Sequence, residues 1–299
     1  MNYYEEIKNE LINNEVYKRV KNYSKNRSDL STYYNVGKLL VEAQGGEDRA
    51  RYGDGLIKEY SKKLTMELNK KFNVTLLKNI RQFYLVSQKS PTMSDQLTWS
   101  HYVELLYLKN LDIINYYVKI AIEQNLSVRE LRAKIKNNEY ERLDDRTKEK
   151  LVNKEELLPQ DFIKNPILIR NSYDYEMISE KILKKLVLED MDNFLTELGD
   201  GFCYIKNEYK IKMGDRYNYL DLLLYNIKYN CYVVVELKVT ELRAEYIGQI
   251  KKYMNYIDKN VRDVCQDKTI GVIICKKDNK FVMEYCSDER IYRTIYVLN

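Results

Sequence analysis

The chain has 299 residues, with 50 Lys and Arg against 45 Asp and Glu and a formal net charge of +5. This length exceeds the usual size of one domain, so two domains are expected. His101 is the only histidine, which excludes metal sites built from several histidines. The glycines form neither the G-x-x-x-x-G-K-[ST] nor the G-x-G-x-x-G pattern, so the common nucleotide-binding loops are excluded as well.

The compartment can be predicted from the N-terminus and the cysteines. The first 15 residues, MNYYEEIKNELINNE, are polar and acidic, unlike a signal peptide or a membrane span. No apolar run elsewhere approaches about 18 residues. The five cysteines are odd in number, lack C-x-x-C spacing and mostly lie in apolar segments, so we expect buried free thiols in a reducing compartment. These features predict a cytoplasmic protein without a membrane association.

The positive charge is concentrated in the first half of the chain. Residues 1–150 hold 27 Lys and Arg against 21 Asp and Glu, whereas residues 151–299 hold 23 against 24. Residues 51–90 alone carry nine basic residues against three acidic ones. Such a basic segment is typical of proteins that bind nucleic-acid phosphates.

Two helices are expected in this basic segment, over residues 56–68 and 75–87, with a turn between them. The pattern suits a helix-turn-helix, whose second helix enters the major groove while flanking basic residues contact phosphate. The side chains expected to contact DNA are Lys62, Lys63, Lys78, Asn79, Arg81 and Gln82. A solvated basic face is the alternative, in which case this domain would serve protein interaction or homo-oligomerisation.

The domain boundary is expected near residues 140–159. Residues 139–156 are dominated by charges, and Pro159 and Pro166 interrupt a continuing helix. We therefore predict a helical domain over residues 1–145, a linker over 146–166 and a second domain over 167–299.

The second half contains a predicted β-hairpin that carries acidic residues. Residues 217–226 and 231–240 are rich in Leu, Val and Tyr, and the polar residues between them suit a short loop. If Asn226 pairs with Cys231, Asp221 lies opposite Glu236 on the same face, and Lys238 also lies on that face. Two facing carboxylates repel each other, and a hard cation with oxygen ligands is the usual remedy. The hairpin therefore predicts a metal site.

A solvated strand edge is the alternative, because Glu-x-Lys also occurs often by chance. The run Tyr232-Val-Val-Val is apolar on both faces, however, and this favours a covered central strand with charges only at its end. Residues 244–256 then show helical spacing, and Gln249 and Tyr253, four apart, share one face. Residues 269–275 form another apolar strand.

The chain resembles the PD-(D/E)XK nucleases at Asp221, Glu236-Leu237-Lys238 and Gln249-x-x-x-Tyr253, the last of which is similar to the QxxxY motif of a RecB-like branch. Further segments resemble, in order, the YhcG-like bacterial nuclease family with its helical accessory domain. These segments are YYNVGKLLVE (33–42), YGDGLIKEYSKKL (52–64), IRQFY (80–84), WSHY (99–102), LSVRELRAKI (126–135), ELGDGF (197–202), DLLLY (221–225), VVVELK (233–238), EYIGQ (245–249), IGVIICK (270–276) and MEY (283–285). Residues 206–208 depart from the family, because its glycine-arginine-glutamine turn is absent.

The resemblance implies an α+β protein, with an all-α, helix-turn-helix-like N-terminal domain and a C-terminal αβββαβ nuclease domain. It implies that Asp221, Glu236 and the Leu237 carbonyl hold Mg²⁺ or Mn²⁺. It implies that Lys238, with Gln249 and Tyr253, serves the attacking water. A further acid is expected from the first core helix, at about residues 175–198. Glu180 is the preferred candidate, Glu176 and Glu189 are rivals, and Glu197 lies at the wrong end.

The sequence thus predicts a metal-dependent deoxyribonuclease. A catalytically silent DNA-binding or complex-forming protein on the same fold is one alternative, and an RNA-directed nuclease is another, because no sequence feature tests for the 2′-hydroxyl. His101 follows Trp99-Ser100 at an expected helix start, so a structural role is favoured for it over a catalytic one.

Overall fold

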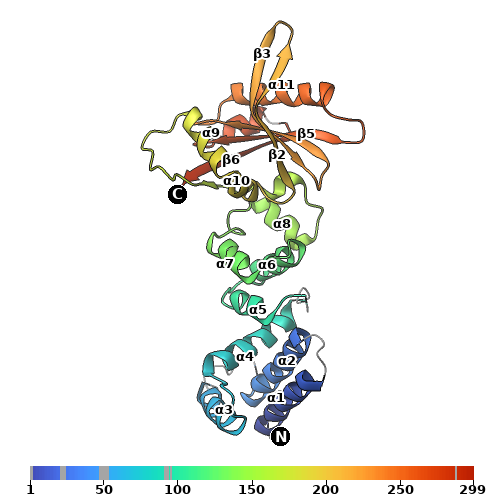
Figure 1. Cartoon of the computed structure of the whole chain (residues 1–299), viewed down its shortest axis with the longest axis vertical. Coiled ribbons are helices and arrows are strands. Elements are labelled where there is room, and N and C mark those ends of the chain that lie inside the picture. Colours follow the sequence, from blue (N-terminus) through green and yellow to red (C-terminus); the bar gives the residue numbers. More distant parts are fainter. Residues whose placement is uncertain (1–2, 21–24, 47–53, 91–93, 95, 287) are drawn as a thin grey trace. The chain divides into compact units, whose positions relative to one another are not determined.

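The computed structural model describes residues 3–20, 25–46, 54–90, 94, 96–286 and 288–299. The chain forms two units with separate cores, Met1–Tyr140 and Glu141–Asn299 (Figure 1). The first unit is helical and the second is built around a mixed sheet, which confirms the predicted α+β class. None of the described helices is both long enough and apolar enough to span a membrane.

The described elements of the first unit are all helices. They are α1 (Tyr3–Val20), α2 (Lys25–Ala43), α3 (Asp54–Glu67), α4 (Val74–Lys89), α5 (Trp99–Leu105), α6 (Leu111–Glu123) and α7 (Val128–Lys136). Apolar side chains of α1 to α4 form one core, with Leu40, Leu64 and Ile80 fully buried. Helices α2 and α4 approach closely at Gly37, where a Cβ atom would lie 2.6 Å from the Ile80 carbonyl oxygen.

Helices α3 and α4 correspond to the two helices expected in the basic segment. The Asn73 side chain caps α4 by accepting a hydrogen bond from the Leu76 amide at 2.8 Å, which fixes where that helix begins. His101 caps the start of α5 in a similar manner. Its Nδ1 accepts from the Thr98 amide at 3.2 Å, and its Nε2 lies 3.0 Å from the Leu126 carbonyl oxygen. The buried ring therefore has the structural environment that was expected.

The second unit begins before its sheet. Its helices are α8 (Asp145–Asn153), the 3₁₀ helix η2 (Pro159–Phe162), α9 (Glu180–Glu189), α10 (Met191–Leu198), α11 (Ala244–Asn260) and α12 (Lys280–Cys286). Its strands are β1 (Ile167–Ile169), β2 (Phe202–Met213), β3 (Arg216–Asn226), β4 (Cys231–Leu237), β5 (Asp267–Cys275) and β6 (Ile291–Leu298). From α9 onward, these elements contain the predicted αβββαβ order, extended by β1, α12 and β6.

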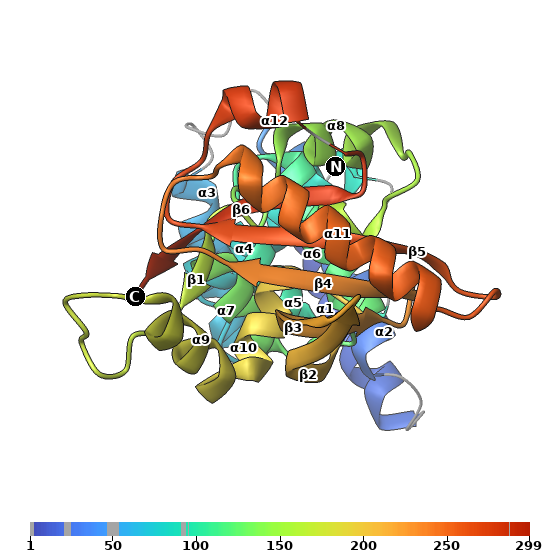
Figure 2. The ribbon, with the colours of Figure 1, turned by 90° about the horizontal axis from the view of Figure 1, so that it is seen from above.

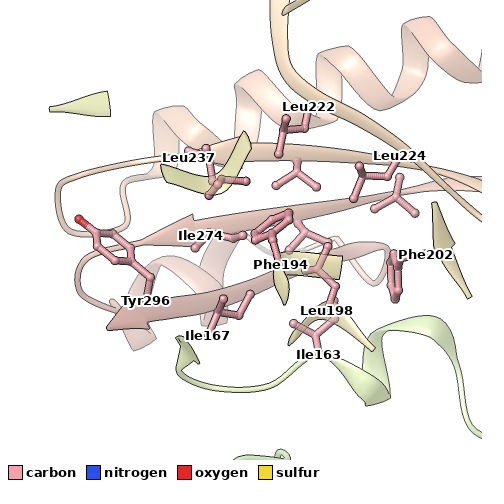
Figure 3. Close-up of a cluster of buried hydrophobic side chains, with 14 of the residues drawn as sticks. Ile163, Ile167, Phe194, Leu198, Phe202, Leu222, Leu224, Leu237, Ile274 and Tyr296 are labelled. Atoms are coloured by element: carbon pink, nitrogen blue, oxygen red, sulfur yellow. The ribbon is translucent and has the colours of Figure 1, made fainter. Parts of the chain in front are cut away.

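The sheet order is β1-β6-β5-β4-β3-β2. Strands β2, β3 and β4 are antiparallel neighbours, whereas β4, β5, β6 and β1 run parallel. Helix α11 covers one face, over β4 and β5 (Figure 2). Helices α9 and α10 cover the other face, where Phe194 and Leu198 pack among Leu222, Leu224 and Ile274 (Figure 3). Strand β4 is thus buried on both faces, as its continuous apolar run predicts.

The segment predicted as a linker, residues 146–166, is instead an ordered part of the second unit. Asp161 accepts from the Leu158 amide and pairs with Lys150 of α8, each at 2.7 Å. Arg142, just before the segment, donates through both terminal nitrogens to the buried Glu197 carboxylate of α10. The Lys150–Asp161 pair is internal although many other charges of this segment are exposed, and a sequence cannot distinguish such a pair from solvated charges.

Two other expectations need correction. The first core helix does not run from 175 to 198, because it begins after the Ser179 cap and breaks at Asp190 into α9 and α10. Of the described thiols, Cys231 and Cys275 are buried but Cys203 and Cys265 are exposed, and all four are free. The Cys286 side chain lies outside the described part of the structure.

Candidate active site at the open end of β3 and β4

The register of β3 and β4 is the one predicted from the sequence. Asn226 pairs with Cys231, and the ladder continues to the Leu222–Val235 couple. One residue further along β3, at Asp221, the regular backbone pairing with β4 has ended. There the Asp221 side chain accepts a hydrogen bond from the Leu237 amide through Oδ2, at 2.9 Å. The acidic residues therefore lie where regular pairing between the two strands ends.

Glu236 is the most buried acidic residue of this site, with 1% of its surface exposed. Its Oε2 accepts from Lys238 Nζ at 3.0 Å and from Gln249 Nε2 at 3.2 Å. Its Oε1 is buried and has no hydrogen-bond partner among the described residues. Burial, and then the charge of Asp221, raise the pKa of Glu236 to about 7, although Lys238 acts in the opposite direction.

Lys238 is also buried and lies 5.2 Å from the centre of the Tyr246 ring. Burial acts to lower the pKa of Lys238, but the charges of Glu236, Glu180 and Asp221 outweigh it, so the pKa lies above its ordinary value. The lysine is thus a fixed ammonium among carboxylates. Such a group can neutralise negative charge that develops on a neighbouring atom.

Helix α11 contributes the predicted glutamine and tyrosine together. Gln249 Nε2 lies 3.2 Å from Tyr253 Oη and 3.2 Å from Glu236 Oε2, so the amide joins the two residues. Burial is the first cause of the raised pKa of Tyr253, and the charge of Glu236 adds to it. In this arrangement the pair positions Glu236, and only indirectly Lys238.

Of the three candidate helix acids, Glu180 is the one that acts electrostatically on Lys238. The charge of Glu180 acts on Lys238 across the site, as the pKa of the lysine shows. Glu189 instead pairs with Lys185 at 3.6 Å, and Glu176 precedes the helix. The Ser179 side chain caps α9 through the Ile182 amide, which fixes the first turn where Glu180 lies.

Sequence reasoning missed Lys184, one helical turn after Glu180. Its Nζ lies 2.7 Å from Asp221 Oδ1 and 3.4 Å from Glu208 Oε1. Glu208 stands in β2 with a φ of 48°, an unusual conformation for a residue other than glycine. It belongs to the segment in which the family's glycine-arginine-glutamine turn is missing. The i, i+4 spacing of Glu180 and Lys184 was the available signal, since it places both on one helix face.

The carboxylates suit a hard cation. Magnesium is commonly held by one or two carboxylates, with water and phosphate oxygens completing its shell. Asp221 and Glu236 provide two such groups, and the unpartnered Glu236 Oε1 is a buried acceptor that a cation would satisfy. No cluster of three or more His, Cys, Asp or Glu side chains suited to a metal occurs in the described part of the chain. A cation at Asp221 would compete with Lys184 for the Oδ1 atom.

The candidate DNA-contacting residues of the first unit differ in exposure. Lys62 and Lys63 are exposed on α3, but Lys63 pairs with Glu59 at 2.7 Å. Lys78 is exposed on α4, whereas Arg81 is half-buried and donates to Gln44. Asn79 and Gln82 of the same helix are also half-buried. The six residues therefore do not form one uniformly exposed face, and their contact with DNA stays a prediction.

Comparison with known proteins covers almost the whole chain. Residues 160–297 match the family described as the YhcG PDDEXK nuclease domain, and residues 8–142 match the DUF1016 N-terminal domain. The chain is 29% identical over 284 residues to the Escherichia coli K12 protein described as "Putative nuclease YhcG", covering 82% of this chain and 76% of that protein.

Two solved structures share part of the chain at low similarity. A repair endonuclease from Pyrococcus abyssi matches 41% of this chain with 21% identity and a TM-score of 0.30. An EndoMS complex with double-stranded DNA matches 43% with 18% identity and a TM-score of 0.28. The chain spans 48% of the length of each. The two family matches and the 29% identical relative confirm the resemblance of this chain to the YhcG-like PD-(D/E)XK nucleases with a DUF1016 N-terminal domain.

Proposed function

We propose that this protein is a divalent-metal-dependent nuclease that hydrolyses phosphodiester bonds in DNA. The observation that carries the proposal is the Glu236 carboxylate, which is buried beside Asp221 and Lys238 and has one oxygen without a partner. A carboxylate that serves only stability is normally fully hydrogen-bonded when it is buried. An incomplete shell in a charged site therefore favours a binding and catalytic role.

Asp221 and Glu236 would hold Mg²⁺ or Mn²⁺, with the Leu237 carbonyl and Glu180 as further candidate ligands. When bound, the cation supplies Lewis acidity at the scissile phosphate and stabilises its developing negative charge. The Leu237 amide keeps Asp221 oriented through its hydrogen bond to Oδ2. Gln249 keeps the Glu236 carboxylate oriented through Oε2, which leaves Oε1 available.

Lys238 is proposed to stabilise the attacking water and the charge of the pentacovalent phosphate. Its Nζ is fixed by Glu236 Oε2, so little reorganisation is needed during the reaction. Lys184 is proposed to release Asp221 when a cation binds. A cytoplasmic location is part of the same proposal, and homo-oligomerisation through the N-terminal domain remains a candidate property.

The proposal is tested by cleavage and binding assays on one set of variants. Asp221→Ala and Lys238→Ala should each lower the cleavage rate by at least about a hundredfold in Mg²⁺ or Mn²⁺, while leaving DNA affinity within a few fold of the wild type. Asp263→Ala and Lys276→Ala, which change exposed residues of the same unit, are the matched controls. Thermal unfolding of each variant shows whether the fold is retained.

The substrates should include linear, circular, single-stranded and branched DNA as well as RNA, each with EDTA, Mg²⁺ or Mn²⁺. Cleavage of DNA that requires a cation supports the proposal. Unchanged cleavage by Asp221→Ala would overturn the assigned site, and DNA binding without cleavage under any condition would favour a recognition protein on a nuclease fold. Preferential cleavage of RNA would leave the site assignment intact but change the substrate.

A further inference from the structure

A groove of about 620 Å³ lies between β2, near its hairpin turn, and the outer face of α11. Lys212 lines it from β2, and Lys251, Lys252, Asn255, Tyr256 and Lys259 line it from the helix. The spacing of Lys252, Asn255, Tyr256 and Lys259 is that of one helix face. None of the described residues that line this groove is acidic.

Most of this positive charge is not neutralised by the protein itself. Lys251 pairs with Asp288 at 3.2 Å. Within the described part of the chain, Lys212, Lys252 and Lys259 have no acidic partner within salt-bridge distance. A second hollow on the same helix differs, because Arg290 there pairs with Asp258 at 2.9 Å. The groove therefore has a net positive field that a polyanion can satisfy.

The groove and the candidate active site share helix α11. Lys252 Nζ lies 5.2 Å from the centre of the Tyr253 ring and 3.4 Å from Asn218 Oδ1 of β3. Tyr253 in turn contacts Gln249, which contacts Glu236. A strand of nucleic acid that follows the groove is thereby brought next to the residues proposed to cleave it.

Gly248 supplies an independent observation. It is an exposed glycine inside α11 that lines the groove, and a Cβ atom built on it would meet nothing within 4 Å. Packing within this unit therefore does not require glycine there, although glycine destabilises a helix interior by roughly 0.5–1 kcal/mol relative to alanine. Close approach of a ligand to the backbone is a physical reason for keeping it.

We propose that this groove binds the sugar–phosphate backbone of the DNA on which the neighbouring site acts. The inference rests on the proposed nuclease function and adds a basic surface in the second unit to the one predicted in the first. Lysines bind phosphates without reading the bases. The groove is therefore a positioning surface that is indifferent to sequence.

The first test measures binding of the full-length protein to a fluorescent DNA duplex of mixed sequence, in EDTA, at several salt concentrations. Lys212→Ala combined with Lys259→Ala should weaken binding by about tenfold at low salt. It should also lower the slope of log Kd against log salt by about two, one for each lost phosphate contact. Lys276→Ala combined with Lys280→Ala removes the same charge from exposed positions outside the groove and should change neither quantity.

The second test adds a bulky side chain to the groove and leaves its lysines unchanged. Gly248→Leu should preserve or raise the melting temperature, because leucine favours helix, while raising the Kd for the same duplex severalfold by filling the groove. The slope of log Kd against log salt should stay closer to the wild-type value than in the Lys212→Ala, Lys259→Ala protein, since the groove lysines remain. A Gly248→Leu protein that binds as the wild type does would overturn the inference, as would equal affinity and salt dependence in the two double-lysine variants.

These outcomes separate the inference from the proposed function. If the groove variants bind normally while Asp221→Ala abolishes cleavage, the groove proposal fails and the nuclease proposal stands. If the groove variants bind weakly while Asp221→Ala still cleaves, the assigned catalytic site fails and the groove stands as a DNA-binding surface.

Discussion

At the scale of single residues, Glu236 shows how position changes the chemistry of an ordinary side chain. Its carboxylate is buried, faces the charge of Asp221 and receives only partial compensation from Lys238. The folded protein therefore binds a proton at Glu236 more tightly than the unfolded chain does. Titratable groups that are perturbed in this manner concentrate at functional sites, which agrees with the role proposed for Glu236.

The pKa of Glu236 is about 7 in the folded protein and 4.5 in a free glutamate. Between these pH values the folded state binds more protons, so stability falls as the pH rises and the loss is complete above about pH 7. The shift corresponds to about 3 kcal/mol. Urea unfolding in EDTA at pH 5 and pH 8 should show this extra loss in the wild type and not in Glu236→Gln. Identical pH dependence in the two proteins would contradict the assigned environment.

At the scale of elements, helix α9 presents different lysines to different surroundings. Lys184 lies on the face that reaches Asp221, whereas the adjacent Lys185 pairs with Glu189 and lies 4.6 Å from the centre of the Tyr173 ring. Consecutive residues on a helix point about 100° apart, so only one of the two can serve the site. The Ser179 cap fixes where α9 begins, and therefore which of the two lysines faces the candidate active site.

Lys184→Ala should strengthen Mn²⁺ binding in the absence of DNA, because it removes a cation that competes for Asp221. Loss of a partly exposed ion pair of this kind corresponds to about 1 kcal/mol, or roughly fivefold in affinity. Calorimetric titration measures the change, and Lys185→Ala should bind Mn²⁺ as the wild type does. Weaker binding by Lys184→Ala would mean that the lysine supports the metal site instead of occupying it.

At the scale of the whole molecule, the second unit extends well before its sheet. Arg142 donates to the Pro166 carbonyl and to Glu197, and the Leu168 amide donates to the same carboxylate at 2.8 Å. Lys164 Nζ donates to the Thr196 carbonyl at 2.7 Å. These contacts connect the start of the unit to α10 and to β1, so the start belongs to the fold of the nuclease domain.

A fragment of residues 141–299 should therefore be more stable than a fragment of residues 167–299. The shorter fragment leaves Glu197 buried without Arg142, and breaking a buried ion pair in this way costs about 3–5 kcal/mol. Urea unfolding of the two fragments measures the difference, and Arg142→Met in the longer fragment should reproduce most of it. Equal stability of the two fragments would instead support the prediction that residues 146–166 are a linker.

Much of the candidate site could be predicted from the sequence because its signals are local. Alternating apolar residues around a short loop specify the register of β3 and β4, and that register alone brings Asp221 and Glu236 together. The i, i+4 spacing of Gln249 and Tyr253 likewise specifies one face of α11. The resemblance at these positions added the expected chemistry, and the matches of residues 160–297 and 8–142 agree with the resemblance itself.

The tertiary structure alone decided which distant side chains meet. Lys184 reaches both Asp221 and Glu208, Arg142 reaches Glu197, and Lys212 and Lys259 line one groove, although the members of each set lie on separate elements. Periodicity tells which face of a helix or strand is apolar, but the partner of a charged face depends on how whole elements pack. The sequence by itself therefore determined the acidic centre of the site. Packing decided where the second unit begins, that the Lys184 side chain lies beside Asp221, and that Lys212 and Lys259 line one groove.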